Sequence, residues 1–389
     1  MSAAIASDVG LPGSGTCPYL VVRNPDTVRD VLHRPMEFSP ANALLAVTPL
    51  TGQALRILQK ARFALPPVLA SNDTETHAGI RKVVAGFFTP AKVAAMEPRI
   101  RGLARESATA AGRLLAAEGS VDLVGAVAAD PPAIVMLEML GLPVRDLPAL
   151  KAWSLDSLEL FWGWPDAGRQ LELARSAADF YRWLREMVLE SVAAPETNLF
   201  NALARHGLST PQICSLGYFL LIAGQETTTQ LISTTLFRLA EGSRGISWTE
   251  AASAPKARDL VRHILATESS VPTWRRVASQ DTVLDGHLVP AGGEVLLELT
   301  GNHGFPWADT AGAETSGNDR PGPTPYGLAF GSGIHRCLGA KLAELEAAVV
   351  VHETAAALKG VRLRDSNPEW IRLLSFQAPR TVTLEFLYS

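Results

Sequence analysis

The stretch of about thirty residues from Pro211 to Ala240 constrains the fold most, because it is typical of one long helix with little charge. Pro211 follows Ser209 and Thr210, and a proline after such a capping pair is typical of a helix start. The stretch is longer than most helices of globular proteins, and no charged residue occurs from Ile213 to Ile222. A helix without a polar face must be covered on all sides. We therefore predict that Pro211–Ala240 crosses the interior of the protein.

The rest of the chain predicts a mainly α protein with a small β portion. Apolar residues at three- and four-residue spacing favour further helices, and after Trp274 short β-like runs alternate with Asp-Gly and Gly-Gly turns. The helices are expected at Thr76–Phe88, at Pro90–Ala117 with a break at Pro98, at Asp166–Val192 and at Leu338–Leu358. The strands are expected at Arg276–Ala278, Thr282–Leu284, His287–Val289, Glu294–Leu299 and Thr381–Phe386, with an irregular stretch at Gly301–Pro325.

Composition argues against several classes of function. The net charge of −4 and the pI of about 6.1 provide no basic field for a nucleic acid. The N-terminus lacks the basic start and apolar stretch of a signal peptide. The most apolar later stretch, Tyr218–Ala223, is too short to span a bilayer. We therefore expect a cytoplasmic protein with no membrane partner, most simply a monomer.

One of the three cysteines lies in a segment that favours chemistry. Cys17, Cys214 and Cys337 are odd in number and far apart, so neither a disulfide framework nor a multi-cysteine metal cage is expected. Most free intracellular cysteines are small buried hydrophobes. Cys337, however, follows two glycines that allow a tight loop and a close approach of backbone to a flat ligand. It also precedes the predicted helix from Leu338, whose N-terminal amides and dipole favour a thiolate, and Gly339 leaves room for a macrocycle.

A second segment, Ala223–Thr229, lies within the long uncharged helix and reads Ala-Gly-Gln-Glu-Thr-Thr-Thr. Taken alone, it is a helix with threonines whose hydroxyls bond back to the preceding turn. The alternative is chemical. Gly224 lets the helix open locally, and an alcohol such as Thr227 beside an acid such as Glu226 can hold water and pass protons.

Together the two segments resemble the cytochrome P-450 family. Residues 330–339 match its cysteine-ligand loop, Phe-Gly-x-Gly-x-His/Arg-x-Cys-x-Gly, at all six fixed positions, and the family's Gly-x-Asp/Glu-Thr segment lies 110 residues earlier. The resemblance runs from Asn24 to the end and implies a single P-450 domain over residues 1–389, with the long helix above a haem b and the cysteine loop beneath it. It implies Cys337 as the iron ligand and Phe330, Gly331 and Gly339 against the cofactor. Gly224, Glu226 and Thr227 would be catalytic, and O2 the co-substrate.

The resemblance also assigns four cationic side chains to the haem propionates. His77 and Arg81 are four residues apart and share one helix face, although such a pair is usually only solvated. His335 lies two residues before the cysteine, and Arg276 opens the first predicted strand. Arginine forks suit carboxylates.

One family feature is missing. The family's Glu-x-x-Arg pair falls on His263 and Ala266 here, while Asp259 and Arg262 have the right spacing one turn too early. Its third partner is equally doubtful, because Arg320 is the only arginine between the predicted propionate ligand and the cysteine loop. The internal salt-bridge triad of the family is therefore expected to be absent.

The resemblance implies a monooxygenase that hydroxylates or oxidatively couples or cyclises an organic substrate, small or carrier-bound, in bacterial secondary metabolism. Electrons would come from a ferredoxin and its reductase, docking on basic residues beside the ligand. The alternative is a degenerate haem-binding member acting as a recruitment module, which the missing triad favours and the intact motifs oppose. The pocket roof is expected after Ala41 and in the aromatic stretch Leu158–Arg185, whose rings are more often core. The proposed docking residues are Lys82, Arg99, Arg336 and Lys341.

Overall fold

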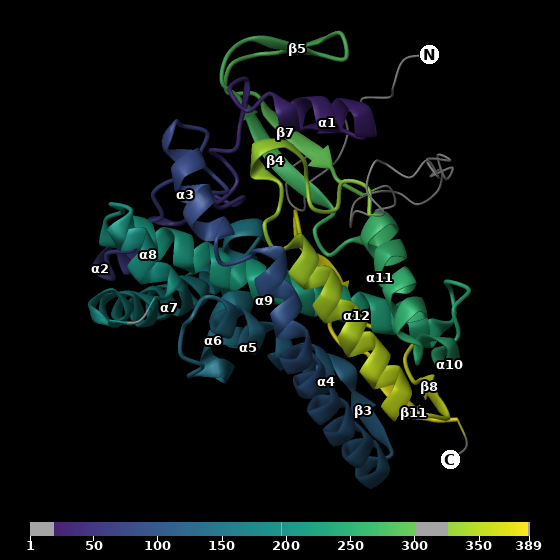
Figure 1. The fold of residues 1–389 in the computed structure, drawn as a ribbon. Coiled ribbons are helices and arrows are strands. Elements are labelled where there is room, and N and C mark those ends of the chain that lie inside the picture. Colours follow the sequence, from purple (N-terminus) through teal and green to yellow (C-terminus); the bar gives the residue numbers. More distant parts are fainter. Residues whose placement is uncertain (1–18, 196, 301–325, 388–389) are drawn as a thin grey trace.

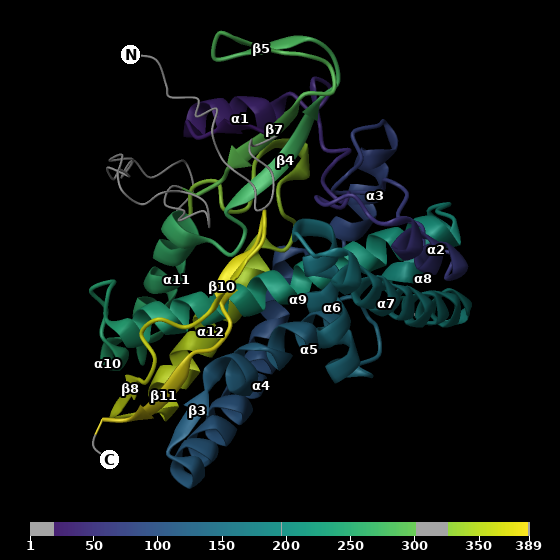
Figure 2. The ribbon, with the colours of Figure 1, turned by 180° about the vertical axis from the view of Figure 1, so that it is seen from behind.

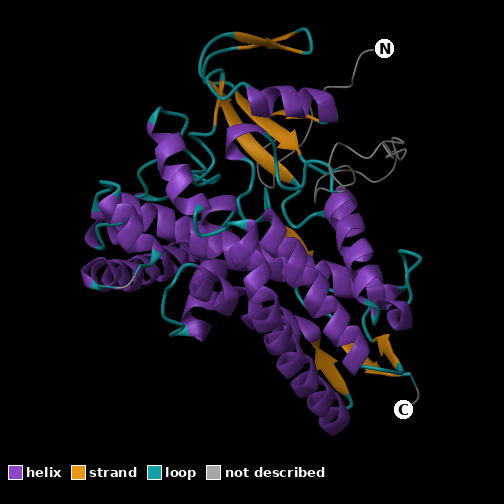
Figure 3. Ribbon diagram, viewed as in Figure 1, coloured by secondary structure: helices purple, strands orange, loops and turns teal. Residues whose placement is uncertain are grey.

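The computed structural model describes residues 19–195, 197–300 and 326–387, and helices dominate it (Figure 3). Predicted residues Arg320 and Gly301–Pro325 therefore lie outside the described part, as does Cys17. Two short helical turns, η1 (Val124–Ala128) and η2 (Gly333–His335), accompany the helices. The helices are α1 (Pro25–His33), α2 (Gly52–Lys60), α3 (Thr76–Ala85), α4 (Pro90–Glu118), α5 (Asp130–Met139), α6 (Leu147–Trp162), α7 (Ala167–Ala193), α8 (Leu199–Arg205), α9 (Thr210–Glu241), α10 (Trp248–Ala251), α11 (Ala254–Glu268) and α12 (Ala340–Ala357).

Helix α9 confirms the prediction of a long interior helix. Ser209 and Gln212 form a capping box at its start, in which Ser209 N–H donates to Gln212 Oε1 over 2.9 Å, and Gly242 ends the helix with a positive φ of 74°. Its 32 residues span about 48 Å at 1.5 Å per residue. Figures 1 and 2 show α9 crossing the molecule, with other helices packed on both of its visible sides.

The predicted break at Pro98 is wrong, because α4 continues through it from Pro90 to Glu118. A proline inside a helix lacks one N–H donor and costs about 3 kcal/mol. Here buried residues lie on both sides of the proline, among them Val93, Ile100 and Leu103, and each fully buried aliphatic side chain contributes about 1.5–3 kcal/mol. Packing against the rest of the core therefore offsets the local cost and keeps the helix whole.

The main sheet has four strands in the order β1-β7-β4-β2 and carries a site residue. β1 (Tyr19–Val22) runs parallel to β7 (Glu294–Glu298), which pairs antiparallel with β4 (Thr273–Ala278), and β2 (Phe38–Ser39) pairs with β4. Arg276 is the fourth residue of β4 and lies opposite Val295. The strand was expected to begin at Arg276. It begins three residues earlier, so Arg276 lies in the middle of the strand.

Three smaller sheets complete the β portion of the described residues. In one of them the predicted Asp-Gly turn is confirmed, because Asp285 and Gly286 have φ of 49° and 80°, as a two-residue hairpin turn requires. The strands are β5 (Thr282–Leu284) with β6 (His287–Val289), β9 (Trp370–Arg372) with β10 (Gln377–Pro379), and β3 (Ser120–Asp122) with β11 (Thr383–Phe386) and β8 (Val361–Leu363). Of these, β5, β6 and β11 lie where the sequence predicts strands, and the other four were not predicted.

Two large apolar clusters flank α9 and fix the elements around it. One gathers α6, α7 and α8 against the first half of α9, and the other gathers α4, α11 and α12 against its second half. Most of the aromatic residues in Leu158–Arg185, where the pocket roof is predicted, belong to this packing, since Phe161, Phe180 and Tyr181 are buried in the first cluster. In the described part of the chain, no helix is both long and apolar enough to cross a bilayer.

Candidate active site

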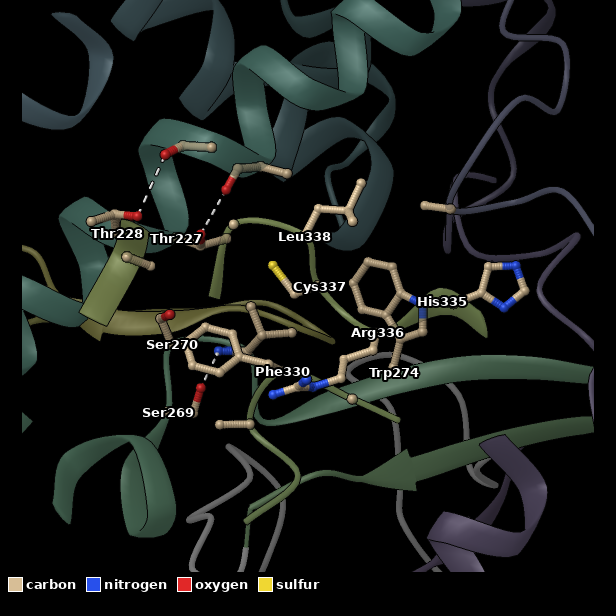
Figure 4. A pocket seen from close by; sticks show the side chains of 18 of the residues that line it. Thr227, Thr228, Ser269, Ser270, Trp274, Phe330, His335, Arg336, Cys337 and Leu338 are labelled. Carbon is tan, nitrogen blue, oxygen red and sulfur yellow. Dashed lines mark hydrogen bonds between the residues drawn. The ribbon is translucent and has the colours of Figure 1, made fainter. Parts of the chain in front are cut away.

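A cavity lies where the middle of α9, the end of α11, β4 and the loop before α12 meet. It encloses about 1540 Å³ of empty space, its open mouth included, and the side chains around it are mostly apolar. Cys337 and Thr227 both line it, although 110 residues separate them in the sequence. Figure 4 shows the sulfur of Cys337 directed toward the side that α9 forms. The two motifs predicted to act together therefore share one cavity.

The loop before Cys337 is tight, as its glycines predict. Gly331 and Gly333 have φ of 66° and 69°, which side chains rarely adopt, and Cys337 N–H donates to the carbonyl of Phe330 over 2.9 Å. The close approach at Gly333 is to protein and not to a ligand, because a Cβ there would lie 2.4 Å from the carbonyl oxygen of Leu32. Gly333 thus lets the loop pack on α1.

The thiol of Cys337 is exposed to the cavity. A Cβ added to Gly339 would find Cys337 Sγ as its nearest neighbour, at 3.9 Å, so this glycine keeps the space beside the sulfur open. Desolvation raises the pKa of Cys337, opposed by the amide of Gly339 and by Arg81. The amides at the start of α12 thus act in the predicted direction, against desolvation. A bound metal ion deprotonates such a thiol.

The four predicted cationic residues converge on one side of the cavity. The rings of His77 and His335 lie 4.7 Å apart, and all four residues, Arg81 and Arg276 included, line the cavity. Arg276 is only 2% exposed, and burial lowers its pKa to about 10. Burial likewise lowers the pKa of His335 to about 4 and lowers the pKa of His77. Burial therefore disfavours the charged form of both histidines in the protein alone.

These side chains fit a ligand that carries carboxylates. Arg276 donates to the carbonyl of Arg275 at 2.8 Å, and among the described residues no carboxylate forms a salt bridge with it, although the charge of Asp73 acts to raise its pKa. His77 Nε2 and His335 Nδ1 are buried without a partner, although His335 Nε2 contacts the carbonyl of Asn72 at 2.8 Å. Buried polar atoms rarely stay unpaired. The propionates of a haem ligated by Cys337 would supply acceptors for Arg276 and for an N–H at His77 Nε2, and their negative charge would favour a proton on His335 Nδ1, so the residues present fit that group.

On α9 the predicted catalytic residues separate into two faces. Gly224 and Thr227 line the cavity, and the Thr227 hydroxyl donates to the carbonyl of Ala223 over 2.6 Å. Glu226 faces the other way, 1% exposed, with Oε1 2.7 Å from Nζ of Lys151 on α6. The one carboxyl among the described lining residues is that of Glu346 on α12, and burial raises its pKa well above the usual value.

Aromatic rings form one wall of the cavity, and only one of them, Trp162, belongs to the aromatic stretch that the sequence predicts for the pocket roof. The ring of Trp162 meets Phe376 edge-on, with 5.0 Å between the ring centroids. Trp274 lies 6.4 Å from both rings, and Phe219 on α9 also lines the cavity. Trp274 could have been predicted to line the cavity, because it lies two residues before Arg276, and alternate side chains of a strand point to the same side. Nothing local distinguishes Phe376.

The family's Glu-x-x-Arg pair has no counterpart at His263 and Ala266, the two positions where the sequence places it. His263 is exposed and Ala266 half-buried, so neither forms the family's internal pair. Arg262 does not pair with Asp259 but with Glu344 on α12, Nε to Oε1 at 2.6 Å. Charge still links α11 to α12, by a different pair of residues.

Comparison with known proteins decides the family. A cytochrome P450 family model matches residues 241–354. The cytochrome P450 YjiB of Bacillus subtilis is 30% identical over 305 residues, which cover 73% of this chain and 72% of YjiB. The chain belongs to the cytochrome P450 family. It is a bacterial-type oxidoreductase, a P450 monooxygenase, and the mainly helical fold predicted from the sequence is confirmed.

Two further P450s show how far the likeness extends. The erythromycin C-12 hydroxylase of Saccharopolyspora erythraea is 28% identical over 306 residues, covering 75% of this chain and 73% of the hydroxylase. The solved structure of cytochrome P450 CREJ in complex with (4-ethylphenyl) dihydrogen phosphate is 26% identical, with a TM-score of 0.83, over 95% of this chain and 92% of CREJ. The P450 fold is therefore retained over nearly the whole chain.

Proposed function

We propose that this P450 is one domain that binds haem b through Cys337 and uses O2 to hydroxylate or oxidatively couple an organic substrate of bacterial secondary metabolism. The observation that carries the proposal is the thiol of Cys337 facing, across one cavity, the α9 residues Gly224 and Thr227. The likeness to an erythromycin hydroxylase supports a natural-product substrate.

Each chemical role that the resemblance implies would fall to a residue of this chain. Arg276, Arg81, His77 and His335 would hold the propionates, and Phe330, Gly331 and Gly339 would lie against the ring. When bound, the haem supplies the oxygen chemistry, with the thiolate of Cys337 as electron donor to the iron.

Two residues of α9 would manage protons. The Thr227 hydroxyl already hydrogen-bonds in the cavity wall and can orient water beside it. Lys151 keeps the neighbouring Glu226 paired away from the cavity. Proton supply by Glu226 therefore requires its side chain to leave Lys151.

The substrate would be largely apolar and neutral. Trp162, Phe219, Trp274 and Phe376 supply a broad apolar wall, while the basic side chains of the cavity are Arg336 in the ligand loop and the four assigned to the propionates. Apolar pockets with few polar anchors bind by burial and shape. A small molecule or the apolar part of a carrier-bound chain satisfies this description.

Electrons would come from a ferredoxin-type partner docking near the ligand loop. Lys82, Arg336 and Lys341 are exposed on that side and could attract an acidic protein. Arg99 is already paired with Glu138 at 2.8 Å, so it would contribute less than predicted.

Turnover with a surrogate ferredoxin and reductase, against a library of neutral apolar natural products, tests the proposal. We expect at least one compound to shift the haem spectrum on binding and to yield a product with one added oxygen or one new intramolecular bond. Haem-loaded protein that binds such compounds yet transfers no electrons with any donor would support the recruitment module instead.

A further inference from the structure

The end of α11 carries an ion cluster that neither the sequence motifs nor the proposed chemistry uses. Glu268 is the last residue of α11 and is 9% exposed. Both of its carboxylate oxygens are engaged. Oε2 accepts from Arg238 Nε at 2.8 Å and from Arg244 Nη2 at 3.1 Å, and Oε1 accepts from Arg238 Nη2 at 2.5 Å. One acid thus joins two arginines.

The cluster ties two separate elements together. Arg238 belongs to α9, three helical turns after Thr227, and Arg244 follows the end of α9. The fork between Arg238 and Glu268 is bidentate, which fixes orientation as well as distance. Phe237 and Trp370 hold the guanidinium of Arg238 further, with ring centroids at 5.2 and 5.5 Å. Burial alone would lower the pKa of Arg238, but its bond to Glu268 more than offsets this, and the pKa is raised.

A carboxylate at this position does not serve its own helix. The C-terminal end of a helix carries partial negative charge, so an acid there is unfavourable unless a cation neutralises it. Glu268 is held by two cations from outside α11. The ion pairs of Glu268 therefore stabilise the contact between α11 and α9 and not α11 itself.

The segment that follows Glu268 directly forms the cavity wall. Ser269, Ser270, Val271, Trp274 and Arg276 all line the cavity, and the last of these is the buried guanidinium assigned to a propionate. At its far end the segment is fixed by pairing of β4 with β7. At its near end, Gln377 donates to the carbonyls of Ser269 and Ser270, both at 3.1 Å.

We propose that Glu268 is a positioning residue: with Arg238 and Arg244 it fixes the end of α11 against α9 and so sets the wall from Ser269 to Arg276 relative to the α9 face that carries Thr227. It does on α11 what His263 and Ala266 cannot do, since neither provides an acid–base pair. The proposal rests on the proposed haem site, because the placement of Arg276 matters for holding the propionates.

The test compares Glu268→Gln with the matched control Glu241→Gln. Glu241 also bonds Arg238, at 2.9 Å, but it belongs to α9 itself and links no second element. Two quantities are measured on haem-loaded protein: the rate of haem transfer to excess apomyoglobin, and peptide-resolved hydrogen exchange. Haem loss from Glu268→Gln should be about tenfold faster, the scale of one charge-assisted bond. Exchange should rise severalfold in peptides over 269–276 and little in peptides around Thr227.

The control variant should leave both quantities near their wild-type values. Should Glu268→Gln fail to fold, Arg244→Gln, which keeps the fork to Arg238, should show the same local pattern at smaller amplitude. Equal exchange in 269–276 for wild type and Glu268→Gln would overturn the proposal, and so would a rise spread evenly over all peptides. A wild type that binds no haem would instead refute the proposed function, and the same exchange comparison on the haem-free proteins would then decide the positioning role.

Discussion

Replacing Gly224 by alanine tests why a glycine stands in the cavity wall. A Cβ at this position would lie 2.3 Å from Cε and 2.6 Å from Sδ of Met136 on α5, well inside contact distance. Alanine gains about 1 kcal/mol over glycine in helix propensity, while overpacking a core typically costs about 1–3 kcal/mol. Gly224→Ala should therefore lower the free energy of unfolding by about 0–2 kcal/mol in denaturant unfolding. At an exposed helix position the same change would raise it.

Shortening Met136 separates packing from any other role of the glycine. Met136→Ala alone should cost about 2–5 kcal/mol, as buried methionines do. In the double variant the new methyl enters space that Met136 vacates. The loss should then be smaller than the sum of the single losses by about 1–3 kcal/mol, a coupling measured by a double-mutant cycle. Additivity within about 0.5 kcal/mol would show that Met136 does not set the requirement and would favour local helix opening instead.

Three further variants test other parts of the site. Thr227→Ala should leave haem content and substrate affinity near normal but lower product formed per reducing equivalent, with peroxide rising, because the hydroxyl acts after binding; unchanged coupling would reduce it to a helix residue. Glu346→Gln should match the wild type in stability near pH 4 and become the more stable of the two as the pH rises above the usual glutamate pKa of about 4.3. The reason is that burial raises the pKa of Glu346 in the folded state, so the unfolded chain ionises first and the wild type loses stability. Urea unfolding at pH 4 and pH 7 measures this, and a wild type as stable as the variant at pH 7 would contradict it. Ala266→Arg should lower the thermal midpoint and haem content slightly, since the new charge lies one turn from Arg262, and added His263→Glu should restore part of the loss; higher haem occupancy in the single variant would refute it.

Local patterns predicted what depends on neighbours in sequence. The capping pair before Pro211 and the absence of charge after it were enough to predict α9, and the glycines around Cys337 were enough to predict a tight loop. Resemblance then added the four residues predicted to hold the propionates, and the fold brings all four to one cavity. These features share a cause, because each depends on a few residues close together in the chain or on a motif with fixed spacing.

What could not be predicted depends on contacts between distant elements. Pro98 stays helical because buried residues on both of its sides pack into the core. Glu226 turns from the cavity because Lys151 of α6 lies beside it. The partner of Arg262 is on α12, and the partners of Glu268 are 24 and 30 residues away. No periodicity or motif specifies such pairings.

The central claim is that Cys337 binds a haem iron as a thiolate, and the spectrum of the reduced, CO-treated protein tests it most directly. Wild type should show the long-wavelength Soret band of a thiolate-ligated CO complex. Cys337→His, where it retains haem, should lose that band and all monooxygenase activity, because imidazole cannot supply the thiolate's electron donation. A wild type with only an imidazole-type spectrum, or a Cys337→His protein that keeps the thiolate band, would contradict the account.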